Sequence, residues 1–244
     1  MRNNDNMRYL DLTLPTAQEN LALDEALLDE AEAAGAPCET LRFWESDRPI
    51  VIVGRSSRLD LEVRRDACRE AGIDVLRRAS GGAAIVAGPG CLMYALVLSH
   101  QLRPELRAID RAHRFVLGMS ISALGPSTPG LKCRGVCDLT LDGRKVSGNS
   151  VRVKRSHLLY HGTILYGFDL EWIGRCLTMP PRQPDYRQSR PHEAFVANLP
   201  LDGGAIRQAL RSAWQADEPC QDWPRELTAR LVADRYGRPE WNTG

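Results

Sequence analysis

The sequence lacks the features that mark several large classes of protein. Neither charge is in surplus, because 32 Lys and Arg residues stand against 31 Asp and Glu residues and leave a net charge of +1. So small a net charge provides no long-range field to attract nucleic acid or an anionic membrane. No apolar run approaches the roughly 20 residues that cross a bilayer. We therefore expect neither nucleic acid nor a membrane as a partner.

Signs of export and of structural zinc are also missing. The seven cysteines form no CxxC pair and have no His-rich segment beside them. Their odd number and scattered positions do not suggest a disulfide framework. The first seven residues are polar, unlike a secretory leader. These absences predict a reduced, soluble, cytoplasmic protein without structural zinc.

Hydrophobic periodicity predicts a strand-rich middle flanked by helices. Helices are expected at 20–34, 61–71, 107–124, 169–177 and 203–214. Strands are expected at 41–44, 50–53, 74–78, 84–86, 91–99, 138–141, 145–153 and 158–166. A long, polar and mobile loop is expected at 179–191. Because strands follow one another through short turns, we predict an α+β fold with mixed, largely antiparallel β-sheets flanked by helices, in one domain over residues 1–244.

The first segment that could carry chemistry follows a predicted strand. Arg77 and Arg78 end this strand, and Ser80, Gly81 and Gly82 come directly after it. Guanidinium groups beside a hydroxyl and exposed main-chain N–H groups suit a phosphate or a carboxylate. A plain Gly-Gly hairpin with surface arginines explains the segment equally well. It is not a P-loop, because no Gly-Lys-Ser/Thr closes it.

Two further segments hold titratable side chains on predicted strands. Lys145 and Asp138 lie on neighbouring strands of a tight hairpin, where the lysine could stabilise a developing oxyanion and the carboxylate could hold Mg²⁺. A solvated lysine after a turn is the simpler alternative. His161, followed by Gly162 and Thr163, lies in an apolar strand and is either a hydrogen-bonded core histidine or a site residue.

Taken in order, these segments resemble the lipoate protein ligase and octanoyltransferase family along nearly the whole chain. The resemblance rests on residues 20–25, 43–45, 52–55, 77–82, 143–149, 161–165, 198–200, 235–237 and 241–242. It implies the biotin/lipoate protein ligase catalytic fold without a C-terminal accessory domain. It also implies that Lys145 contacts the acyl carbonyl and the α-phosphate, and that Asp138 assists Mg²⁺. The implied acyl- and nucleotide-binding residues are Arg77, Arg78, Ser80, Gly81, Gly82, Ala83, Gly148, Asn149, Ser150, His161, Gly162 and Thr163.

The chain departs from the usual ligase pattern at several positions. Ala83 replaces a third glycine, Ala87 and Gly88 replace a His-Asp pair, and Cys91 and Cys137 each replace an asparagine. These departures leave open whether the chain uses ATP alone, uses it with a separate accessory ligase subunit, or does not use it.

Three functions therefore remain open. In the first, the chain is a ligase that activates lipoate or octanoate with ATP and Mg²⁺ and passes the acyl group to a lysine of a lipoyl carrier domain, of the glycine cleavage H protein or 2-oxoacid dehydrogenase E2 type. In the second, Cys133, or else Cys137, carries the acyl group as a thioester, with Lys132, Arg134 and Lys145 lowering the pKa of the thiol. In the third, it is a non-catalytic lipoyl-binding subunit. For the acyl tail we expect an apolar slot beside the glycine pair, lined by residues 75–98.

Overall fold

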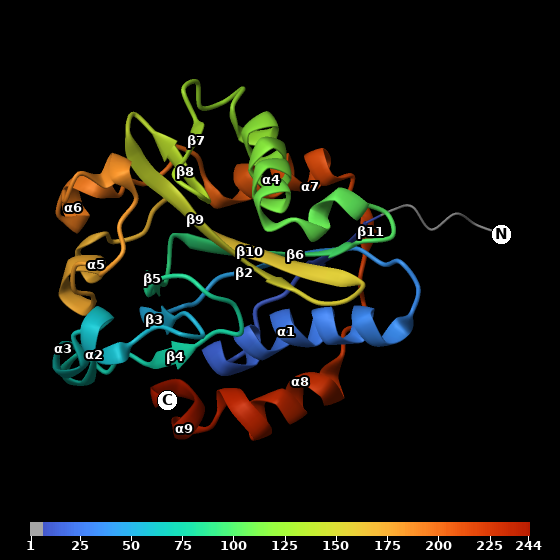
Figure 1. Cartoon of the computed structure of the whole chain (residues 1–244), viewed down its shortest axis with the longest axis horizontal. Coiled ribbons are helices and arrows are strands. Elements are labelled where there is room, and N and C mark those ends of the chain that lie inside the picture. Colours follow the sequence, from blue (N-terminus) through green and yellow to red (C-terminus); the bar gives the residue numbers. More distant parts are fainter. Residues whose placement is uncertain (1–6) are drawn as a thin grey trace.

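The computed structural model describes residues 7–244, which form two sheets with helices around them (Figure 1). The large sheet is mixed, with β1 parallel to β2 and β11 and the other neighbours antiparallel. Its strands lie in the order β11 (Glu218–Pro219), β1 (Arg8–Asp11), β2 (Thr40–Trp44), β6 (Cys91–Ser99), β10 (His157–Leu165), β9 (Arg144–Val153), β8 (Asp138–Leu141) and β7 (Lys132–Arg134). The small sheet has the order β4 (Val75–Arg77), β3 (Ile50–Val53) and β5 (Ile85–Ala87).

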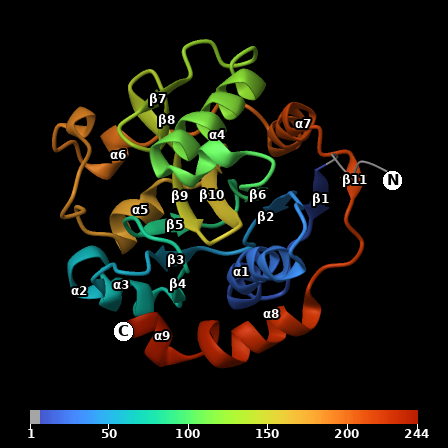
Figure 2. The ribbon, with the colours of Figure 1, turned by 45° about the vertical axis from the view of Figure 1, so that its right-hand side comes forward.

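Helices cover both faces of the large sheet (Figures 1 and 2). One face carries α1 (Ala17–Ala34) and beyond it α8 (Arg225–Leu231), while the opposite face carries α4 (Ile109–Leu124) and α7 (Gly203–Trp214). The short helices around the small sheet are α2 (Leu59–Glu62), α3 (Arg65–Glu70), α5 (Glu171–Cys176), α6 (His192–Phe195) and α9 (Pro239–Thr243). Two 3-10 turns, Pro104–Arg107 and Asp185–Arg187, and a π-helical turn, Val232–Tyr236, complete the elements.

Local sequence signals set both ends of helix α1, and most of the helix is buried. Thr16 and Glu19 form a reciprocal capping box at its start, and Gly35 ends it in the left-handed conformation at φ 66°. The helix packs between the large sheet and α8, so that even its polar residues Asn20, Asp24 and Glu25 are buried. Each of these three is hydrogen-bonded or ion-paired, as burial of a polar group requires.

A buried ion pair joins α1 to the large sheet. The guanidinium of Arg42, on β2, is fully buried and contacts the carboxylate of Asp24. It also donates to the Asn20 side chain at 2.7 Å and to the main-chain oxygen of Leu12 at 3.1 Å. The charge of Arg42 and the contact with His161 hold the pKa of Asp24 below its usual value despite burial. The pair is therefore charged and almost fully satisfied.

The predicted α+β fold is confirmed, with local corrections. Helix α1 begins at Ala17 rather than at residue 20, because the capping box extends it by a turn. The single helix expected at 61–71 is two helices, since Val63 leaves the helical path to bridge Leu177. Periodicity missed β1, β7, β11, α8 and α9, which are short or lie near the ends of the described chain. Among residues 7–244, no helix is both long and apolar enough to span a bilayer.

We predict that Asp24→Ala lowers the free energy of unfolding by about 3–5 kcal/mol, because it leaves the Arg42 guanidinium buried without its counter-charge. Urea-induced unfolding followed by circular dichroism measures the change. The matched control is Asp74→Ala, which removes the partner of Arg48 in an exposed ion pair of 2.7 Å and should cost less than about 1 kcal/mol. Equal losses of unfolding free energy in the two variants would show that the buried pair contributes no more to stability than the exposed pair does.

Candidate active site

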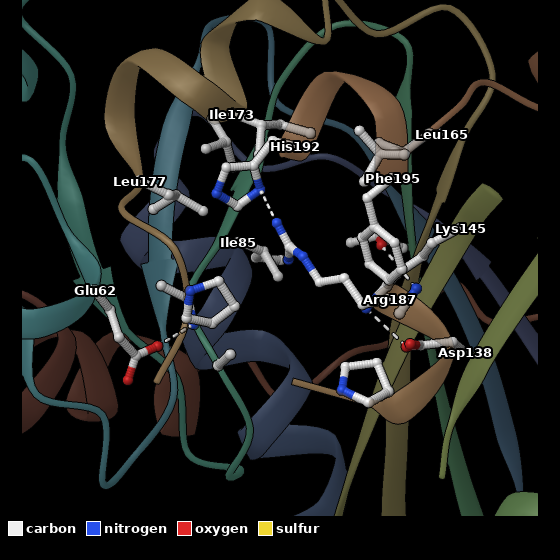
Figure 3. A pocket seen from close by; sticks show the side chains of 18 of the residues that line it. Glu62, Ile85, Asp138, Lys145, Leu165, Ile173, Leu177, Arg187, His192 and Phe195 are labelled. Atoms are coloured by element: carbon white, nitrogen blue, oxygen red, sulfur yellow. Dashed lines mark hydrogen bonds and ion pairs between the residues drawn. The ribbon is translucent and has the colours of Figure 1, made fainter. Parts of the chain in front are cut away.

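Two cavities meet at Lys145. The inner chamber is lined by apolar side chains from three elements, Leu21, Ile52 and Met93, together with His161, Cys137 and Asn149. The outer chamber is lined chiefly by Ile173, Leu177, Arg187, His192, Phe195 and Val196 (Figure 3). Both chambers are lined by Ala83, Ala84, Ile85, Asp138, Lys145, Gly148 and Thr163. The ammonium group thus lies where the two spaces join.

The position of Lys145 depends on a β-bulge and on a glycine. The register of β8 against β9 shifts between Leu139 and Thr140, which leaves Val146 without a partner. The lysine then reaches across Gly148, where a Cβ atom would lie 2.7 Å from Nζ. Its Nζ lies 2.7 Å from Oδ1 of Asp138, in an ion pair that is only partly exposed. The predicted proximity of the two side chains is therefore correct.

The carboxylate of Asp138 is engaged on both oxygens. Lys145 holds Oδ1, and the hydroxyl of Tyr186 donates to Oδ2 at 2.7 Å. Burial and the carboxylate raise the pKa of Tyr186, so its hydroxyl stays protonated. Residues 7–244 contain no group of three or more His, Cys, Asp or Glu side chains that could hold a metal ion. The Mg²⁺ role expected for Asp138 would therefore rest on one carboxylate together with the phosphates of a bound nucleotide, and it stays a prediction.

The loop after β4 is organised by Arg78, whose buried guanidinium points into it. It donates to the carbonyls of Gly81 and Ala83, the latter at 3.1 Å, and to the Ser80 hydroxyl at 3.2 Å. Burial lowers the pKa of Arg78 to about 10, so that it remains a cation at neutral pH. A Cβ atom on Gly54 would lie 1.9 Å from the carbonyl oxygen of Gly82. The loop therefore packs directly on a bare main chain.

Arg77 lines neither chamber, although the resemblance places it among the acyl- and nucleotide-binding residues. Successive strand residues point to opposite faces, and the guanidinium of Arg77 points away from both chambers. It donates to main-chain oxygens of Gly54, Arg55, Ser57, Trp241 and Gly244. Every one of its nitrogens is thus used to fasten the C-terminal segment to the loop after β3. Its contribution is structural.

His161 is buried in the core and also lines the inner chamber, so it fits both alternatives that the sequence left open. Its ring lines the inner chamber, while Nε2 lies 2.5 Å from the Ser80 hydroxyl. Nδ1 lies 3.5 Å from the carboxylate of Asp24. Ser80 and Gly81 line neither chamber. They act indirectly, because Ser80 fixes the imidazole and the Gly81 carbonyl accepts from Ser150 at 2.9 Å.

The remaining predicted binding residues lie where expected. Gly82, Ala83, Gly148, Asn149, Ser150, Gly162 and Thr163 all line the inner chamber. The expected apolar slot is only partly correct: it includes Ile85 and Met93, but Leu21 of α1 and Ile52 of β3 lie outside the range 75–98. Those two residues come to the chamber through tertiary packing, which periodicity does not reveal.

The two candidate cysteines differ in position. Cys133 is exposed and lines neither chamber, whereas Cys137 lines the inner chamber and its thiol donates to the main-chain oxygen of Asn149 at 2.9 Å. Burial and the Asp138 carboxylate raise the pKa of both thiols; Lys145 opposes this at Cys137 without reversing it. The expected lowering of the thiol pKa by basic neighbours is therefore not found at either cysteine. Cys137 is the better placed of the two, because it lines the inner chamber.

Sequence reasoning missed the wall of the outer chamber. The expected loop at 179–191 contains the turn Asp185–Arg187 and leads into α6. Arg190 ties it to the main-chain oxygens of Gly143 and Tyr186, both at 3.0 Å. Tyr186, Arg187 and His192 are thereby placed beside the hairpin of β8 and β9, which is distant from them in the chain. A stretch of Pro and Arg carries no local signal for this contact.

Comparisons with known proteins agree on one family. The family described as the lipoyl protein ligase A/B catalytic domain matches residues 16–203. The octanoyltransferase LipM of Carboxydothermus hydrogenoformans is 27% identical, over 96% of this chain and 97% of the relative.

Among solved structures, a bipartite lipoate protein ligase from Thermoplasma acidophilum, determined with its E2 lipoyl domain, has a TM-score of 0.80 at 22% identity and covers 98% of this chain and 96% of that one. A lipoate-protein ligase A bound with ATP also has a TM-score of 0.80 at 22% identity, over 98% and 99% of the two chains. At this identity, the structural likeness establishes the fold alone.

Proposed function

The chain belongs to the lipoyl protein ligase A/B catalytic domain family, and from this premise we propose that it is an ATP-dependent lipoate or octanoate protein ligase. In this role it joins the acid to AMP and then transfers the acyl group to a lysine of a lipoyl carrier domain. Membership of this family supports acyl transfer to a lipoyl carrier, and the use of ATP is the finer part of the proposal.

The observation that supports this function is the pair of chambers joined at Lys145. An acyl adenylate has an apolar tail and a nucleotide, linked through a mixed anhydride between them. The inner chamber offers Leu21, Ile52 and Met93 to the tail, and the outer chamber offers a second, separate space to the nucleotide. Lys145 then lies beside the anhydride, where charge develops in both steps.

In the first step, a carboxylate oxygen of the acid attacks the α-phosphorus of ATP, and pyrophosphate leaves. In the second step, the neutral amine of the carrier lysine attacks the acyl carbon, AMP leaves with the bonding electrons, and the amine loses a proton. Lys145 stabilises the negative charge on the phosphate and on the acyl oxygen, and its ion pair with Asp138 orients it before the substrates bind.

The acceptor in this proposal is a lipoyl carrier domain of the glycine cleavage H protein or 2-oxoacid dehydrogenase E2 type. The similar Thermoplasma acidophilum ligase was determined with an E2 lipoyl domain, which supports a carrier of this class. That ligase is bipartite, so the proposal includes a separate accessory subunit as a partner in ATP use.

A second candidate function is octanoyl or lipoyl transfer without ATP, and the position of Cys137 favours it. The thiolate would attack the carbonyl of an acyl thioester, the donor thiol would leave, and the carrier lysine would then attack the new thioester. Cys137 lies in the inner chamber beside Lys145, and the relative LipM is an octanoyltransferase. A non-catalytic lipoyl-binding subunit is less well supported, because the Lys145–Asp138 pair is in place.

Both catalytic mechanisms require the charge of Lys145, so Lys145→Ala should lower the rate of carrier acylation by about 100-fold to 1000-fold. The rate is measured by mass spectrometry of an apo-carrier domain incubated with octanoate and ATP, or with an octanoyl thioester. Lys154→Ala is the matched control, because Lys154 lies directly after the same strand and pairs with Asp29 instead. A Lys145→Ala enzyme that retains most of its turnover would remove this lysine from the site.

If the inner chamber binds the acyl tail, acids with longer alkyl chains should compete more strongly for it. Each buried methylene contributes about 0.8 kcal/mol, so octanoate should bind on the order of 100-fold more tightly than butyrate. Competition against radiolabelled octanoate measures the difference. If butyrate competes as well as octanoate does, the inner chamber is not the acyl site.

ATP and Cys137 distinguish the two mechanisms. We expect radiolabelled pyrophosphate to exchange into ATP when lipoate or octanoate is present, and Cys137→Ser to keep carrier acylation within a few fold of wild type. Cys133→Ser is the control, because this exposed sulfur lines neither chamber. A transferase would instead show no exchange, would lose turnover in Cys137→Ser, and would accumulate an acyl adduct on Cys137 that hydroxylamine removes.

A further inference from the structure

Arg187 is a buried cation in the outer chamber. Only 4% of the residue is exposed, and it lines the chamber among Ile85, Ile173, Leu177 and Phe195. Figure 3 shows its guanidinium extending across the cavity toward His192 and away from Lys145. The guanidinium carbon lies 4.5 Å from the centre of the Phe195 ring. Its surroundings are thus largely apolar.

The hydrogen bonds of Arg187 leave its charge unmatched. Nε donates to the main-chain oxygen of Arg190 at 3.0 Å, and Nη2 lies 3.4 Å from Nδ1 of His192. His192 uses Nε2 to donate to the Thr178 carbonyl at 3.0 Å, and burial lowers its pKa, so the ring is neutral and Nδ1 is the acceptor. Within residues 7–244, Arg187 forms no ion pair, and Nη1 donates to no protein group. Glu193 acts on it only at longer range.

The other buried arginines of the site region are satisfied differently. Arg42 has the carboxylate of Asp24, and Arg77 and Arg78 are surrounded by main-chain carbonyls. A guanidinium that is buried without such partners costs free energy. Arg187 offsets this cost only by contacts with one carbonyl, one imidazole and one aromatic ring.

We propose that Arg187 binds a phosphate group of the activating nucleotide or of the acyl donor in the outer chamber. This inference rests on the proposed function and deepens it, because it names the group that recognises that phosphate. The planar fork of a guanidinium matches two phosphate oxygens, and the apolar walls strengthen the pairing by excluding water. Lys145 serves the reacting carbonyl and the α-phosphate at the junction, and Arg187 holds a second phosphate farther out. That phosphate belongs either to ATP, beyond its α-phosphorus, or to the phosphopantetheine arm of an acyl thioester.

Binding measurements on the full chain test the proposal without requiring turnover. Isothermal titration compares ATP with adenosine, and octanoyl-phosphopantetheine with octanoyl-pantetheine. In the wild type, one phosphorylated compound should bind more tightly than its dephosphorylated counterpart. Arg187→Met should lower the affinity for that phosphorylated compound by about 10-fold to 100-fold and leave the affinity for its dephosphorylated counterpart unchanged. The affinity of Arg187→Lys should fall between those of the wild type and Arg187→Met. The matched control is Arg175→Met, which removes an exposed arginine stacked on Trp172 in the neighbouring α5.

A thermal melt excludes a purely structural role. Because Arg187 has no carboxylate partner, Arg187→Met should unfold at a temperature no lower than that of the wild type. A lowered melting temperature together with unchanged phosphate preference would overturn the proposal. So would a wild type that does not distinguish phosphorylated from dephosphorylated compounds. A wild type that prefers octanoyl-phosphopantetheine and ignores ATP would support the role of Arg187 and refute the ligase function, so the two failures are distinguishable.

Discussion

The buried pair of Arg42 and Asp24 is the interaction on which the site depends. It fastens α1 to β2, and the same carboxylate lies within 3.5 Å of His161 on β10. His161 in turn contacts Ser80, at the start of the loop that borders both chambers. One charged contact in the core therefore sets the distance between a helix, the central sheet and a substrate-facing loop. A buried charge network of this kind tolerates few arrangements, because each partner must be satisfied at once.

The loop itself is built with its carbonyl oxygens turned toward the protein. Arg78, Ser57 and Ser150 take the oxygens of residues 81–83. The carbonyl oxygens of three consecutive residues are therefore all satisfied by protein donors. Gly54 permits this arrangement, because any side chain there would occupy the place of the Gly82 oxygen. The glycine on which this loop depends thus lies outside the loop, directly after β3.

Local contacts were predictable from the sequence, and distant ones were not. The nearness of Lys145 and Asp138 follows from a short turn in which Asp142 and Gly143 have positive φ, a conformation that these residues adopt readily. The different roles of Arg77 and Arg78 could be anticipated only in part: alternation places them on opposite faces, but the sequence does not say which face is the site. Tyr186 and Arg187 reach the site through main-chain contacts of Arg190, and no periodic pattern records such a contact.

The departures from the ligase pattern carry unequal weight once they are located. Ala87 and Cys91 are fully buried in the core, and Gly88 packs against Phe168 and Pro49; none of the three lines either chamber. Their replacement alters the support of the site rather than the groups that meet a substrate. Cys137, by contrast, lies in the inner chamber beside Lys145. An asparagine there would offer an amide to the substrate, whereas this chain offers a thiol whose pKa is raised by burial and by the Asp138 carboxylate. The chemical distinction between activating the acid with ATP and carrying it as a thioester therefore concerns this single sulfur and whether substrate binding ionises it.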